Sequence, residues 1–271
     1  MNAADPRARQ SHRSDEHGEQ GGGRRERHPF LVEGRADVLA HRGASSLHPP
    51  GNTERAFAAA LEMGFDHLET DVQASRDGVV VVFHDERLDE ATTGTGAIGD
   101  HTWSELRTVR TTVDGRATDD GLVRLDELLE RFPTAFFNID IKTDATVEPA
   151  ARILVESDAR SRVCVAAFGW RRLRRVRRRL GPGWCTAMAK PEIAVTVVAA
   201  RLRLPVPRLA DVVQLPTTYR ERTIVDRRLV DACHRSGVAV HVWTVNDPGE
   251  ASRLQALGVD AVISDRPDLV G

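Results

Sequence analysis

Short apolar segments rich in Val and Ile alternate along this chain with longer segments of helical period. Strands buried on both faces are apolar throughout, and their alternation with amphipathic helices predicts parallel βα units. Eight such segments occur, the number that closes a TIM-type (β/α)8 barrel. The predicted strands cover residues 36–43, 67–73, 135–142, 162–168, 184–188, 211–216, 238–245 and 261–265.

One further apolar run, residues 79–85, follows the second predicted strand after the turn Arg76-Asp77-Gly78. We expect it to fold back as a hairpin and not to form a ninth barrel strand. Residues 86–106 are rich in Gly and Thr, which predicts a substrate-side loop leading into a helix capped near Thr102. The predicted fold is therefore an α/β barrel with a small hairpin and loop insertion after its second strand.

The segments between the strands have the features of outer barrel helices. Thr53 is a suitable N-cap for the helix that follows it, and Gly64 suits the left-handed position at its end. Residues 171–179 carry many arginines, but the apolar side chains among them recur at helical spacing. We interpret the arginines as the solvated face of an ordinary helix, and keep an anionic partner or membrane surface as the alternative.

Charge and hydropathy narrow the possible partners. The 38 Lys and Arg residues nearly balance the 40 Asp and Glu residues, for a formal net charge of −2. No broad positive field is present to attract nucleic acid, so an anionic substrate must be recognised by local cations or a metal ion. No apolar run approaches the roughly 20 residues that span a bilayer, so no membrane insertion is expected.

Cys164, Cys185 and Cys233 are far apart in sequence, odd in number and outside any CxxC spacing. This pattern favours neither a disulfide framework nor a zinc site. We therefore expect reduced thiols and a cytoplasmic protein.

Residues 1–34 are charged and poor in apolar side chains, without the apolar core of a signal peptide. We expect them to form a disordered tail before one catalytic domain, residues 35–271. Three histidines of this tail are expected to be solvated: His12, His17 and His28.

Acidic side chains interrupt the second and third predicted strands. Glu69 and Asp71 are two residues apart, so both side chains leave the same face of the strand. Together with Asp140 they give three carboxylates, an oxygen set that suits Mg²⁺ or Ca²⁺ better than zinc. The alternative is that these acids form salt bridges with Arg42 and Lys142 and hold no metal.

Two histidines are expected at the same rim, because His41 ends the first strand and His84 ends the hairpin. A pair of imidazoles can act as acid and base near neutral pH, although an isolated strand histidine is usually a packed residue. Arg42 and Lys142 are suitable cations for phosphate oxygens.

Several ordered motifs make the chain resemble the glycerophosphodiester phosphodiesterase family from about Asp37 onward. The combination is far more specific than any one motif. The motifs are LAHRGAS (residues 39–45), GNTERAF (51–57), GFDHLETDVQASRDGVVVVFHDERL (64–88), TTGTG (92–96), NIDIK (138–142), VHVWTVND (240–247) and GVDAVISDRP (258–267).

This resemblance implies a metal-dependent hydrolysis of small glycerophosphodiesters to sn-glycerol 3-phosphate and an alcohol, and it assigns roles to the candidate residues. The implied roles are acid and base for His41 and His84, metal ligands for Glu69, Asp71 and Asp140, phosphate contacts for Arg42 and Lys142, and a glycerol-side aromatic for Trp243. In the family, a neighbouring glycerol hydroxyl is thought to attack phosphorus and give a cyclic phosphate; direct attack by water is the alternative.

Two positions depart from the family pattern. Gly51 stands where a Glu usually precedes the Asn-Thr pair, and Asp140 stands where the third metal ligand is usually Glu. These departures keep a noncatalytic barrel that binds phosphorylated ligands open as an alternative. A lysophospholipase D-like enzyme is a second alternative, which we disfavour because residues 86–123 do not form an apolar entrance. The sequence does not indicate an oligomeric state.

Overall fold

Eight parallel strands form a barrel in the computed structural model, which describes residues 27–31 and 38–271. Their order is β10-β13-β14-β1-β2-β7-β8-β9, and a parallel bridge between Ala187 and Val212 joins the two ends. The predicted barrel is therefore confirmed. Its strands are β1 (Val38–His41), β2 (His67–Ala74), β7 (Phe136–Ile141), β8 (Val163–Ala166), β9 (Cys185–Thr186), β10 (Val212–Pro216), β13 (Ala239–Trp243) and β14 (Ala261–Ser264).

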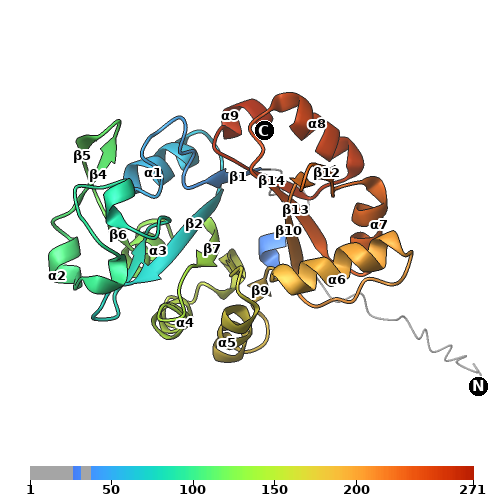
Figure 1. Ribbon diagram of the computed structural model, residues 1–271, viewed down its shortest axis with the longest axis horizontal. Helices are drawn as coiled ribbons and strands as arrows, with labels where there is room; N and C mark the ends of the chain where they lie inside the picture. Colours follow the sequence, from blue (N-terminus) through green and yellow to red (C-terminus); the bar gives the residue numbers. More distant parts are fainter. Residues whose placement is uncertain (1–26, 32–37) are drawn as a thin grey trace, which may run out of the picture.

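Helices surround these strands (Figure 1). The outer helices are α1 (Glu54–Glu62), α3 (Leu125–Arg131), α4 (Val147–Glu156), α5 (Trp170–Leu180), α6 (Lys190–Arg201), α7 (Arg227–Arg235), α8 (Pro248–Leu257) and α9 (Pro267–Val270). As predicted, the Thr53 side chain accepts a hydrogen bond from the Ala56 N–H and caps α1. Gly64 follows this helix with a left-handed φ of +94°.

The arginine-rich segment is an ordinary outer helix, as predicted. Helix α5 buries Leu173, Val176 and Leu180. Its arginines form ion pairs with neighbouring elements: Arg172 with Asp144, Arg177 with Glu192, and Arg179 with Glu148. Acidic side chains of the same chain thus neutralise much of this positive charge.

The insertion after β2 begins with the predicted hairpin, since β3 (Val80–Val82) pairs antiparallel with β2 and also with β6 (Val123–Arg124). Between β3 and β6 lie two 3₁₀ turns, the short helix α2 (Trp103–Leu106) capped at Thr102, and a hairpin that we did not predict. That hairpin joins β4 (Arg110–Val113) to β5 (Arg116–Gly121).

The prediction that residues 86–106 form a loop on the substrate side is wrong. Leu88, Ile98 and Leu106 are buried in a small apolar cluster of the insertion's own, which holds the segment on the flank of the barrel. In Figure 1, α2, β4 and β5 lie on the opposite side of the molecule from α6 and α7. No residue of this fully described segment lines the pocket at the barrel mouth.

Part of the expected disordered tail is ordered, so that prediction is wrong for Pro29–Leu31, which form a 3₁₀ turn. Phe30 is completely buried against the rings of His67 and Phe136, at the amino ends of β2 and β7. His28, expected to be solvated, is half-buried, and its Nδ1 accepts a hydrogen bond from the Phe30 N–H. Residues 1–26 and 32–34 of the predicted tail, with His12 and His17, lie outside the described residues.

All three cysteines are buried free thiols, as expected. Among the described helices, none has the length and apolarity required to cross a bilayer.

Candidate active site

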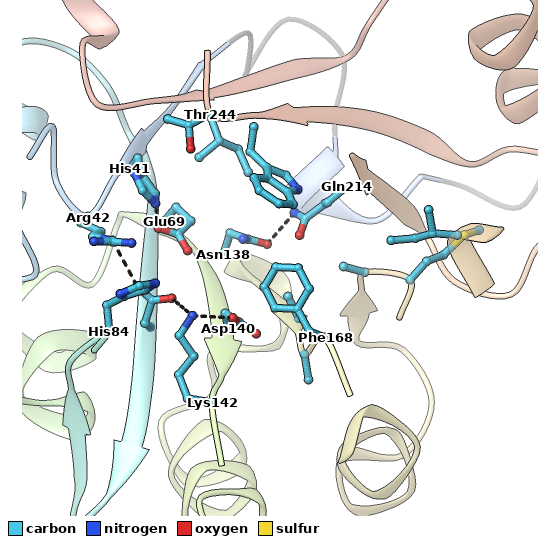
Figure 2. A pocket seen from close by; sticks show the side chains of 18 residues that line it. His41, Arg42, Glu69, His84, Asn138, Asp140, Lys142, Phe168, Gln214 and Thr244 are labelled. Atoms are coloured by element: carbon cyan, nitrogen blue, oxygen red, sulfur yellow. Dashed lines mark hydrogen bonds and ion pairs between the residues drawn. The ribbon is translucent and has the colours of Figure 1, made fainter. Parts of the chain in front are cut away.

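A pocket of about 170 Å³ opens at the carboxyl ends of the barrel strands, the end where barrel active sites are built. All eight residues that the sequence analysis assigned to the site line it, and Figure 2 labels six of them. They are His41, Arg42, Glu69, Asp71, His84, Asp140, Lys142 and Trp243.

Strand alternation explains this convergence. On β2 the apolar residues Leu68 and Val72 pack outward among the core residues beneath the helices, so the alternate residues Glu69 and Asp71 face the interior. Strand β7 pairs with β2 and places Asp140 directly beside Asp71.

His41 lies between two carboxyl groups. Its Nδ1 is 2.6 Å from Oδ1 of Asp265, and its Nε2 is 3.5 Å from Oε2 of Glu69. Burial by itself would lower the pKa of His41, but these carboxylates outweigh burial and raise it. The site therefore favours the protonated imidazole.

Asp265 was not among the predicted site residues. It follows β14, and it also accepts hydrogen bonds from the Ser45 hydroxyl at 2.6 Å and from Nδ2 of Asn246 at 3.0 Å. Although burial opposes ionisation, these three partners hold the pKa of Asp265 well below its usual range. The sequence signal for Asp265 was its position as a polar residue at the end of the last strand. That strand, β14, pairs with β1, which carries His41.

His84 has a similar carboxylate partner. Its Nδ1 is 2.7 Å from Oδ1 of the next residue, Asp85, so the other ring nitrogen is left for the pocket. Each of the two imidazoles is thus oriented through Nδ1 by an acid that does not line the pocket.

A tight loop after β1 positions Arg42. Its backbone has a left-handed φ of +51°, which is strained for a residue with a side chain. Gly43 follows, and a Cβ there would lie 2.7 Å from the backbone of Ala56 and Phe57, so only glycine fits between the loop and α1. The Arg42 Nε approaches Asp71 Oδ2 at 3.4 Å.

Gly51, the first departure from the family pattern, lies in a turn that is too crowded for a side chain. A Cβ at Gly51 would lie 2.6 Å from Cβ of Ser45 and 2.8 Å from Cβ of Arg42. The turn therefore has no room for a larger residue without moving Arg42. The neighbouring Asn52 is buried, accepts a hydrogen bond from the Thr70 hydroxyl and donates one to Asp71 at 3.4 Å.

Lys142 joins two of the three expected metal ligands, so the salt-bridged arrangement that we considered from the sequence is present. Its Nζ lies 2.8 Å from Asp71 Oδ1 and 3.0 Å from Asp140 Oδ2 (Figure 2). Burial raises the pKa of Asp71, but Lys142 and Arg42 more than offset that effect and lower it. Within the described part of the chain, no three acids, histidines or cysteines form a ready-made metal cluster.

The remaining carboxyl oxygens nevertheless fit a cation. Glu69 Oε2 and Asp140 Oδ1 are buried without a hydrogen-bond partner among residues 27–31 and 38–271. Burial, and then the Asp71 carboxylate, raise the pKa of Glu69 to about 8. A divalent ion would supply the positive charge that these oxygens lack, and an all-oxygen donor set suits a hard cation.

Aromatic and amide side chains form the other wall of the pocket. Phe168 and Trp243 meet edge to face with ring centroids 5.8 Å apart. Gln214 donates a hydrogen bond to Asn138 Oδ1 at 2.9 Å (Figure 2). We did not predict Phe168, Gln214 or Asn138, because isolated aromatic and amide residues on a strand have the same pattern as core residues.

His241, on β13 two residues before Trp243, does not line the pocket. It is 2% exposed in the barrel interior, where burial lowers its pKa to about 4. It is therefore a neutral core histidine near pH 7.

Two carboxylate-backed imidazoles beside two cations suit the cleavage of a phosphate ester, so fold and site together define a barrel hydrolase of such esters. Comparison with known proteins gives the family. The glycerophosphoryl diester phosphodiesterase family matches residues 41–269, and this chain belongs to it. It is accordingly an enzyme, a phosphoric diester hydrolase, and not the noncatalytic barrel that we kept as an alternative.

Relatives of this chain agree with the assignment. It is 34% identical to a Mycobacterium tuberculosis protein named "Probable glycerophosphodiester phosphodiesterase 2", over 89% of this chain and 91% of the relative. The solved glycerophosphodiester phosphodiesterase of Agrobacterium tumefaciens is 25% identical, with a TM-score of 0.72 over 87% of this chain and 98% of the other. A phosphodiesterase of Oleispira antarctica, solved with the product sn-glycerol-3-phosphate, has the same fold at 24% identity, with a TM-score of 0.73 over 89% and 96%.

Proposed function

We propose that the enzyme hydrolyses glycerophosphodiesters to sn-glycerol 3-phosphate and an alcohol, with His41 and His84 as its acid and base and a divalent cation as its cofactor. The observation that carries the proposal is that all eight predicted residues line one pocket. The Oleispira antarctica relative holds the corresponding product, which supports the choice of substrate.

His41 is suited to be the acid. Its raised pKa favours the protonated imidazole, and Asp265 fixes the ring through Nδ1. Nε2 then gives its proton to the departing alcohol. His84 is suited to be the base, because Asp85 on its Nδ1 leaves the other nitrogen free to accept a proton from the nucleophile.

Arg42 and Lys142 are the cations for the nonbridging phosphate oxygens. Arg42 can hold two oxygens at once, and Lys142, which pairs with the other oxygen of Asp71, adds a point charge. Their positive charge neutralises the negative charge that concentrates on these oxygens in the transition state. Trp243, with Phe168, forms the apolar wall against which the glycerol carbons pack.

Glu69, Asp71 and Asp140 would hold the divalent cation, with Mg²⁺ or Ca²⁺ suited to this oxygen set. When bound, the ion would polarise the phosphoryl group as a Lewis acid. In the structure Lys142 pairs with Asp71 and Asp140, so its ammonium lies beside two of the carboxylates that would hold the ion. The shorter side chain of Asp140 is compatible with this role, because its Oδ1 is the buried oxygen without a hydrogen bond within residues 27–31 and 38–271.

Turnover of glycerophosphocholine tests the proposal. We expect hydrolysis that EDTA abolishes, that Mg²⁺ or Ca²⁺ restores, and that His41→Ala or His84→Ala reduces by about 100-fold or more, the usual range for general acid and base catalysis. EDTA-resistant turnover would contradict the metal requirement, and full activity of either variant would contradict its assigned role. Phosphorus NMR during turnover distinguishes the routes, since a cyclic phosphate forms only if the glycerol hydroxyl attacks.

The cytoplasmic location remains a prediction that rests on the cysteine pattern. Cell fractionation followed by immunodetection tests it, and recovery of the protein outside the cytoplasm would contradict it.

A further inference from the structure

Gln73 is a buried polar residue near the catalytic pocket to which no role has been assigned so far. It lies on β2 two residues after Asp71, so its side chain leaves the same face of the strand as Glu69 and Asp71. It is only 5% exposed and does not line the pocket. A buried amide must find hydrogen-bond partners, and the identity of those partners indicates what Gln73 does.

The partners of Gln73 are the backbone carbonyls of three consecutive residues. Its Nε2 donates to the oxygen of Asp85 at 2.7 Å and to that of Phe83 at 3.2 Å, and it lies 3.5 Å from the oxygen of His84. An amide nitrogen has two hydrogens, so the two shorter bonds use both of them. These residues, 83–85, contain the candidate base and the acid that orients its ring.

Residues 84 and 85 lie beyond the end of the hairpin. The pairing of β3 with β2 stops at Val82, and His84 and Asp85 follow it outside any helix or strand of the described chain. The sheet ladder therefore does not fix their backbone, and side-chain hydrogen bonds determine where it lies. Gln73 supplies such bonds from β2, the strand that also carries two of the candidate metal ligands.

We propose that Gln73 is a positioning residue, which holds His84 within reach of the bound phosphodiester. This rests on the proposed function, in which His84 is the base. Asp85 orients the imidazole through Nδ1, whereas Gln73 fixes the backbone from which both side chains project. A base accepts a proton only within hydrogen-bond reach, and a displacement of about 1 Å can lower the rate about 100-fold.

Replacing Gln73 with Met tests the proposal, because Met has a similar length and no donor for the carbonyls. We expect kcat for glycerophosphocholine to fall about 10- to 100-fold. KM should stay within about twofold, because the bonds of Gln73 go to the backbone of residues 83–85 and not to the cations assigned to the phosphate. A wild-type kcat, or a raised KM with unchanged kcat, would overturn the proposal.

A double-mutant cycle with His84→Ala shows whether Gln73 acts through the base. Once the imidazole is absent, Gln73→Met should lower the residual kcat by less than about threefold, because the group that it positions is already gone. Equal losses in the two backgrounds would show a general effect on the site and contradict the proposal. Full activity of His84→Ala alone would instead contradict the proposed function, so the two failures can be distinguished.

Thr146→Val is the matched structural control. The completely buried Thr146 hydroxyl accepts a hydrogen bond from the Ala74 N–H at 2.9 Å, next to Gln73 on the same strand. We expect Thr146→Val and Gln73→Met both to lower the urea midpoint of unfolding, and Thr146→Val to keep wild-type kcat. An equal loss of kcat in the control would show that activity follows stability, which refutes a positioning role. Gln73→Asn, whose amide is one methylene shorter and withdrawn from Asp85, replaces Gln73→Met in both comparisons if that variant does not fold.

Discussion

Replacing Asp265 with Asn should change the protonation of His41 while preserving the shape of the site. In the wild-type protein, the ionised Asp265 accepts from His41 Nδ1 at 2.6 Å and so fixes the proton on that nitrogen. An Asn amide at the same place can donate to Nδ1, which moves the proton of the neutral ring to Nε2. It also removes a negative charge that raises the pKa of His41.

The size of the effect follows from this contact. A hydrogen bond to a charged group contributes about 1.5 to 3 kcal/mol, so its loss should lower kcat/KM about 10- to 150-fold. The pH profile should also change. An acid works only while protonated, so activity falls as the pH rises through its pKa; with the Asp265 charge removed, that fall should begin at lower pH.

Steady-state kinetics across pH and ¹⁵N NMR of the metal-free protein measure these two effects. NMR reports which imidazole nitrogen carries the proton, and this does not depend on turnover. Asp268→Asn is the matched control, because Asp268 is exposed, pairs with Arg266 outside the pocket and should keep wild-type kinetics. Wild-type kcat/KM, pH profile and His41 tautomer in Asp265→Asn would refute the positioning role.

Three further predictions concern stability and loop geometry. The folded protein keeps His241 neutral down to about pH 4, whereas the unfolded chain protonates it near pH 6.5. The contribution of neutral His241 to the free energy of unfolding is therefore complete above pH 6.5, and in urea unfolding that free energy should fall by about 2 kcal/mol between pH 7 and 5. His241→Gln should flatten this dependence of the free energy on pH, and an unchanged dependence would count against the prediction. Phe30→Ala should lower the free energy of unfolding by about 3 to 5 kcal/mol, and a loss below about 1 kcal/mol would show that Pro29–Leu31 contribute little to the barrel. Gly51→Ala should lower the free energy of unfolding by about 1 to 3 kcal/mol and reduce kcat/KM by displacing Arg42. The control is Gly99→Ala, whose new Cβ has no neighbour nearer than 3.8 Å, and it should be close to wild type in calorimetry and kinetics.

The sequence by itself determined the barrel and most of the site. Its apolar runs matched all eight strands, because strands covered on both faces must be apolar. Glu69 and Asp71 had to face the same way, since strand side chains alternate with a period of two. Polar residues at strand ends then identified His41 and Lys142 before any contact was known, because the carboxyl ends of parallel barrel strands share one rim.

Only the tertiary structure decided which groups meet. Asp265 supports His41 across 224 residues because β14 pairs with β1, and Lys142 takes the oxygens of Asp71 and Asp140 because β7 lies beside β2. Local periodicity fixes the face on which a side chain lies, whereas its partner depends on long-range packing and on competition among neighbouring charges.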